Sequence, residues 1–279
     1  MNTRVAVSLL IGVLAAGLVA TAVAQDGTPN LGSAQIGQVD SRWFIETRYF
    51  DAGGTAYDEQ DNRSFSIGFS SPVNADTEFD LMYSSSRTAT DVGGLHITDR
   101  EVLSPVLKHR INGLGSTALT VSVGADVAID DFTGMVHSTA ITENDFTPAA
   151  RLALEWGGAT RWQLAAQVAA WDNTFATGVP GYGTVAAVGG GIVWPISGRL
   201  TLMGDVMVPV NGDNFYDEAT ETVDAQPVWS AGAAWRWGGV RNTTLTVYAT
   251  NAIGPTLANS IIVSPENSMG LGAALRCDF

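Results

Sequence analysis

Twelve segments of roughly ten residues that look like β-strands follow one another along this 279-residue chain. Side chains that alternate between apolar and polar with a period of two line opposite faces of a strand. The predicted strands are residues 41–51, 62–71, 76–86, 99–110, 117–129, 146–156, 160–171, 182–195, 198–209, 226–237, 242–251 and 269–279. Because no helical period competes with this pattern, the sequence predicts an all-β fold.

The connections between these segments alternate in length along the whole chain. The short ones are residues 72–75, 111–116, 157–159, 196–197 and 238–241, and most contain Gly or Pro, which suit tight hairpins. The long ones are residues 52–61, 87–98, 130–145, 172–181, 210–225 and 252–268. Strict alternation gathers all the long loops at one end of an antiparallel up-and-down meander. A soluble sandwich with Greek-key connections is not expected to sort its loops in this way.

Most of the tryptophans gather at the end that carries the short connections. They are Trp43, Trp156, Trp162, Trp194, Trp235 and Trp237, whereas Trp171 and Trp229 fall at the opposite end. Aromatic rings mark the two interfaces of a membrane barrel, but core tryptophans have no reason to collect beside short turns. We therefore predict that Trp43, Trp156, Trp162, Trp194 and Trp235 form an interfacial girdle.

The last segment, residues 269–279, alternates strictly and ends on an aromatic residue. One face carries Met269, Leu271, Ala273, Leu275, Cys277 and Phe279, and the other is small or charged. A chain that ends in this way resembles the Gram-negative outer-membrane β-barrels, whose last strand carries the assembly signal. The resemblance implies a transmembrane antiparallel up-and-down β-barrel of about 12 strands with Phe279 as its assembly signal. It also implies contact with outer-membrane lipid and lipopolysaccharide and with the barrel-assembly machinery.

The N-terminus has the features of a secretory signal. Arg4 supplies a positive charge, residues 5–19 are almost wholly apolar, and Ala22-Val23-Ala24 fits the small-x-small cleavage rule. We predict a signal peptide over residues 1–24, a polar Gly-rich periplasmic lead-in over residues 25–40, and the barrel over residues 41–279. The alternative, an uncleaved anchor helix, has an apolar run that is short for a membrane span.

Charge and cysteine content exclude two classes of protein. The chain has 14 basic and 28 acidic residues, and cleavage after Ala24 would remove one basic residue and leave a net charge of −15. So acidic a chain is not expected to bind nucleic acid. Cys277 is the single cysteine, so no internal disulfide can hold the exported protein together.

The polar faces of the predicted strands carry many charges of both signs. In a membrane barrel these charges line the lumen while the apolar faces contact lipid. The lumen or selectivity candidates are Arg42, Glu46, Arg48, Glu78, Asp80, Arg151, Glu155, Arg161, Arg199, Asp205, Arg236 and Arg276. They could form a salt-bridge network that stiffens the wall, or a charged constriction that selects solutes. The segment 99–110 is ambiguous, because both faces are partly polar and Pro105 interrupts the ladder with a bulge or a lipid-facing kink.

No constellation of catalytic or metal-binding residues emerges from the sequence. His96, His109 and His137 are too widely spaced for a zinc motif. His137 and Ser138 are adjacent, whereas the twelve-stranded outer-membrane phospholipases carry their His and Ser two positions apart on a strand. Neighbours on an extended chain point to opposite faces. We therefore predict no catalytic residues, no metal and no cofactor.

The predicted function is that of an outer-membrane porin or substrate-selective channel for the passive diffusion of small hydrophilic solutes. The likeness to the twelve-stranded nucleoside and acidic-sugar channels is one of architecture only. Three alternatives remain open: a plugged, non-conducting scaffold or receptor barrel, an outer-membrane hydrolase, and a secreted soluble sandwich.

Overall fold

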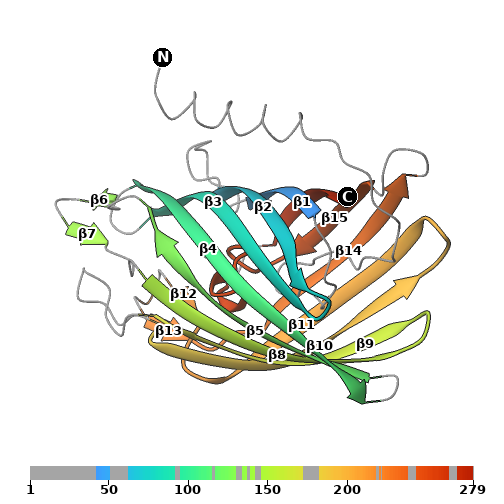
Figure 1. Cartoon of the computed structure of the whole chain (residues 1–279). Helices are drawn as coiled ribbons and strands as arrows, with labels where there is room; N and C mark the ends of the chain where they lie inside the picture. Colours follow the sequence, from blue (N-terminus) through green and yellow to red (C-terminus); the bar gives the residue numbers. More distant parts are fainter. Residues whose placement is uncertain are drawn as a thin grey trace.

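The chain folds into a single closed β-barrel, with the strands running obliquely around a common axis (Figure 1). The computed structural model describes residues 42–50, 62–91, 95–114, 117–129, 134–136, 139–141, 146–171, 182–217, 220, 222–237, 243–263 and 269–278. The predicted signal peptide, the lead-in and Phe279 lie outside these residues. The all-β, up-and-down barrel predicted from the sequence is confirmed, and the soluble sandwich is excluded.

Twelve antiparallel strands form the wall, in the ring order β1-β16-β15-β14-β11-β10-β9-β8-β5-β4-β3-β2. They are β1 (Arg42–Phe50), β2 (Asn62–Asn74), β3 (Thr77–Asp91), β4 (Leu95–Leu114), β5 (Thr117–Ala128), β8 (Phe146–Gly157), β9 (Arg161–Ala170), β10 (Thr184–Pro195), β11 (Leu200–Asn211), β14 (Val228–Trp237), β15 (Thr243–Thr250) and β16 (Gly270–Asp278). The first and last strands close the ring over a register that runs from Arg42↔Asp278 to Phe50↔Gly270. Because each strand pairs with its sequence neighbour, the short turns share one end of the barrel, which we call the short-turn end, and the opposite end is the long-loop end.

The alternation along each strand is turned inside out relative to a soluble domain. On β8, Leu152 is 50% exposed on the outer surface, whereas Arg151 next to it is only 4% exposed. On β5, Val123 is 55% exposed while Ser122 is buried. Apolar side chains therefore cover the outside, and the charged and polar side chains of these strands point inside, as in a barrel surrounded by lipid.

Strands β3 and β4 are longer than predicted. The sequence predicts a long loop over residues 87–98. Residues 87–91 and 95–98 instead continue the hairpin, with pairs from Arg87↔Asp99 to Asp91↔Leu95. β4 therefore has 20 residues, compared with 8 in β15. Thr88 and Thr90 on β3 and Ile97 and Thr98 on β4 favour this extension, because β-branched residues suit a pleated surface.

Pro105 lies within β4 on the outward face, opposite Leu81 of β3. The β4–β5 ladder lacks pairs at Ser104 and Pro105 but has the same register on both sides of this gap. Of the two predicted alternatives, a bulge or a lipid-facing kink, the bulge is absent at Pro105: proline lacks an N–H and interrupts the ladder without shifting it. Ser104 instead donates a side-chain hydrogen bond to Asp126 of β5, which bridges the gap.

Short secondary elements occupy three of the predicted loops. β6 (Gly134–Val136) pairs with β7 (Thr139–Ile141), and β12 (Phe215–Asp217) pairs with β13 (Thr222–Asp224). A 3-10 helix, η1 (Asn259–Ile261), lies in the connection between β15 and β16. Among the described residues, no helix has the length and apolar character to cross a membrane.

We predict that a charge on the outer face of the barrel destabilises the protein according to its depth. Leu152→Arg, at the middle of β8, should lower the free energy of unfolding by about 2–4 kcal/mol. Val73→Arg, which is exposed beside a short turn, should cost about 0–1 kcal/mol because it can reach the interface. Urea titration of refolding into lipid vesicles measures both values, and equal losses would contradict the lipid-facing assignment of Leu152.

Candidate functional site

The connection between β15 and β16 folds into the barrel and crosses its lumen. We call residues 252–263 the lumen loop. Its side chains reach Asp126 on β5, and β5 and β15 are separated by five strands in either direction around the ring. The loop therefore spans the full width of the barrel in its long-loop half.

Two residues of the far wall hold the lumen loop through hydrogen bonds. The Asp126 carboxylate accepts hydrogen bonds from Thr256 Oγ1 and from Asn259 Nδ2, the latter at 3.1 Å. Gln167 Nε2 on β9 donates to Leu257 O at 2.6 Å and to Ser260 Oγ at 2.8 Å. Asp126 and Gln167 are themselves almost inaccessible to solvent. Buried polar groups on the wall and the loop thus satisfy one another.

Asn214 holds the near side of the loop. It is fully buried, and its Nδ2 donates to Ile261 O at 2.8 Å and to Gln226 O at 2.9 Å. Its backbone oxygen accepts a hydrogen bond from Val263 N at 2.9 Å. Asn214 therefore joins the lumen loop to the connection between β11 and β14.

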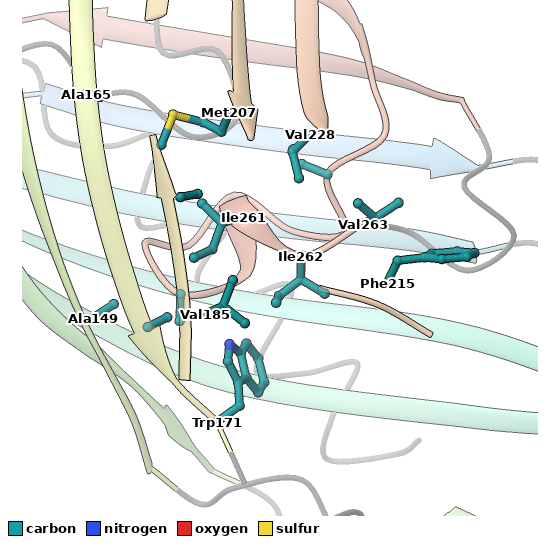
Figure 2. Packing of buried hydrophobic residues seen from close by; sticks show 14 of the residues in the cluster. Ala149, Ala165, Trp171, Val185, Met207, Phe215, Val228, Ile261, Ile262 and Val263 are labelled. Atoms are coloured by element: carbon teal, nitrogen blue, oxygen red, sulfur yellow. The ribbon is translucent and has the colours of Figure 1, made fainter. Parts of the chain in front are cut away.

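Apolar packing adds to these bonds on one side of the lumen. Ile261, Ile262 and Val263 lie among inward-facing side chains of β8 to β11 and β14 (Figure 2). The wall residues of this cluster are Ala149, Ala153, Ala165, Ala169, Trp171, Val185, Ala187, Met207 and Val228, together with Phe215 of β12. Burial of such side chains stabilises the inward position of the loop through the hydrophobic effect.

The short-turn half of the lumen is polar and carries charge of both signs. Lys108 Nζ on β4 lies 3.2 Å from Glu78 Oε1 and also forms an ion pair with Asp80, both on β3. All three side chains are buried. A buried cation shared between two carboxylates limits the electrostatic cost of placing them together.

The charged side chains of β8 and β9 also form interactions with side chains of other wall strands. Arg151 Nη1 donates to Gln167 Oε1 at 3.2 Å and interacts electrostatically with Asp205 of β11. Arg161 Nη1 forms an ion pair with Glu155 Oε1 at 3.4 Å. Gln167 thus connects the charged side chains of the wall to the lumen loop, because its amide contacts both Arg151 and the loop.

The predicted lumen residues fall into three groups. Those that face inward and are buried or half-buried are Glu78, Asp80, Arg151, Glu155, Arg161, Asp205, Arg236 and Arg276. Arg199 differs, because it is exposed in the turn before β11, where Ser197 Oγ accepts hydrogen bonds from Arg199 N and Leu200 N. Arg42, Glu46 and Arg48 lie on β1, whose backbone is placed but whose side chains lie outside the described part. Their role in selectivity stays a prediction.

The predicted girdle residues lie near the short-turn end. Trp162, Trp194 and Trp235 are exposed on the outer surface, and Trp156 is paired with Trp162 across the turn between β8 and β9. The side chain of Trp43 lies outside the described part. Their function as a girdle also stays a prediction.

Several polar residues that line the lumen were not singled out from the sequence. Lys108 and Arg110 lie on the ambiguous segment, where both faces contain polar residues. Asp126 shares its face with Ser122 and Thr120, so the period of two was sufficient to find it. Nothing in the sequence indicated Gln167 or Asn214, because their importance depends on a loop that folds inward.

Within the described ranges, no group of three or more His, Cys, Asp or Glu side chains could hold a metal ion. His137 and Ser138 lie outside these ranges, so the hydrolase alternative is untested. What the described lumen can do is bind polar groups and ions through Arg, Lys, carboxylate and amide side chains.

No family model matches the sequence, and no curated protein matches it. Among solved structures, an outer membrane channel from Pseudomonas putida F1 is similar over 91% of this chain and 100% of its own, with a TM-score of 0.56 and 10% identity. LpxR from Salmonella typhimurium (86% and 100% covered, TM-score 0.48, 11% identity) and outer membrane phospholipase A from Escherichia coli (85% and 90%, 0.46, 12%) are more distant.

The chain therefore has the fold of the outer-membrane β-barrels, the class that its sequence resembles. The closed ring and its apolar outer surface agree with the predicted location in the outer membrane.

We predict that Lys108 stabilises the short-turn half of the lumen by neutralising Glu78 and Asp80. Lys108→Met should lower the free energy of unfolding by about 3–5 kcal/mol, because two buried carboxylates lose their cation. The triple variant Lys108→Met, Glu78→Gln, Asp80→Asn should recover part of the loss. Urea unfolding measures both, and a triple variant no more stable than Lys108→Met would contradict this role.

Proposed function

We propose that the protein is an outer-membrane channel for small hydrophilic solutes that is closed in the conformation described here. The observation that carries the proposal is the charged lining of the lumen, where side chains of both signs point inward. They are Lys108, Arg110, Arg151 and Arg276 together with Glu78, Asp80, Glu155 and Asp205. Such a lining can replace the hydration of a polar solute at several successive positions. The similar fold of the Pseudomonas putida F1 outer membrane channel supports the same proposal.

A second function, that of a non-conducting scaffold or receptor barrel, is favoured by a different observation. The lumen loop crosses the barrel, and many inward side chains of the wall, such as Ser66, Ser122 and Ser230, are buried. An open pore would expose the side chains that line it. The two proposals therefore differ in one respect: a channel requires that the lumen can open, and a scaffold does not.

The proposed channel inserts through the barrel-assembly machinery, lies in outer-membrane lipid with lipopolysaccharide, and takes small hydrophilic solutes as its cargo. It includes no catalytic step. A lipid-release assay that compares the wild type with Ser138→Ala tests that part, because a hydrolase would release fatty acid from outer-membrane lipid and lose this activity in the variant.

We predict small, rare conductance steps from the purified wild-type protein in planar bilayers. A variant in which residues 252–263 are replaced by a short Gly-Ser linker should conduct more, and should let proteoliposomes swell in sugars of graded size. The control is heat-denatured protein in the same detergent. If neither the wild type nor the linker variant passes current above the lipid baseline, the scaffold proposal replaces the channel.

A further inference from the structure

We propose that the lumen loop is a gate, hinged at β15 and β16 and latched to the opposite wall by Asp126 and Gln167. This inference rests on the proposed channel function and specifies how the channel opens. It depends on three observations. The loop has its own internal hydrogen bonds, its polar contacts with β5 and β9 among the described residues are made by side chains of the wall, and its near side is attached through the backbone.

The lumen loop has its own internal hydrogen bonds. Its ends are joined by an antiparallel bridge between Ala252 and Val263 and by a bond of 2.9 Å from Ile253 N to Ile262 O. Inside, Ser260 N donates to Thr256 O at 3.0 Å, and Asn259 N donates to Thr256 Oγ1 at 3.1 Å. A compact loop whose ends are close together can move without losing these bonds.

The far side of the loop meets the wall through a different kind of contact. Asp126 and Gln167 bind it through their side chains, and no strand ladder joins the loop to β5 or β9 among the described residues. Residues 251–263 contain no charged side chain. Release from β5 and β9 therefore breaks hydrogen bonds and separates no ion pair.

The near side of the loop is attached more firmly. Its two ends continue towards β15 and β16, and the backbone groups Ile261 O and Val263 N bind Asn214. Ile262 and Val263 are also packed beside Val228 and Phe215. This asymmetry places the hinge at the near side and the latch at the far side.

The latch consists of a carboxylate with two neutral donors and an amide with two acceptors. Hydrogen bonds to an ionised group are roughly twice as strong as neutral ones, so Asp126 is the principal part of the latch. The cluster around Ile261 keeps the closed state dominant, because opening exposes apolar surface. Few open events are therefore expected until the latch is weakened.

The test is single-channel recording of the full chain in planar bilayers, with Cys277→Ser as the background. Asp126→Ala removes two charge-assisted hydrogen bonds to the loop. It should raise the open fraction by at least on the order of tenfold, the effect expected from losing one such bond. Ser122→Ala, a buried polar residue on the same strand and face, is the matched control and should leave the open fraction unchanged. Gln167→Ala tests the second anchor independently if Asp126→Ala does not fold.

A cysteine pair makes the same test reversible. Asp126→Cys with Thr256→Cys replaces two side chains in direct contact, so oxidation should lock the loop to β5 and stop the openings. Reduction should then give an open fraction above that of the wild type, because the carboxylate is absent. Migration on gels before and after heating shows that each variant is folded.

The gate is refuted if the folded Asp126→Ala and Gln167→Ala variants both behave like Ser122→Ala while the wild type conducts. It is also refuted if the oxidised cysteine pair conducts as well as the reduced pair. The channel proposal fails in a different way, since the variant with residues 252–263 replaced by a linker would then pass no current.

Discussion

A backbone polar group without a partner is the condition that this structure must avoid, because lipid supplies no hydrogen bonds in place of water. The chain avoids it by pairing every wall strand on both sides, including β1 with β16. Even the proline in β4 is accommodated, since Pro105 interrupts one ladder without changing its register and Ser104 bridges to Asp126. Any function of the lumen thus depends on closure of the ring.

Closure also decides where the polar side chains must go. With apolar residues such as Leu152 and Val123 on the outside, Arg151 and Ser122 have only the interior available. The interior therefore collects charges and must arrange them in pairs, as Lys108 does with Glu78 and Asp80. The sequence left two interpretations of these charges open, a salt-bridge network and a charged constriction. The two do not exclude each other, because paired side chains can still line a path for solute.

The two halves of the lumen have different chemistry, and the lumen loop explains the difference. The long-loop half is apolar along β8 to β11 and β14, which suits Ile261, Ile262 and Val263. The passage of hydrophilic solutes does not require an apolar wall. The packing of a folded loop against the wall does require one. Gln167 lies between the halves and binds Arg151 on one side and the loop on the other.

By itself, the sequence determined the barrel, its twelve strands and the face on which Arg151, Glu155 and Asp205 lie, because a period of two assigns each side chain to one face. It could not show that residues 87–91 and 95–98 extend a hairpin, since their composition suits a loop as well as a strand. Nor could it place Asp126, Gln167 and Asn214 beside residues 252–263. Those contacts join positions up to 133 residues apart, and only closure of the ring brings β5 opposite β15.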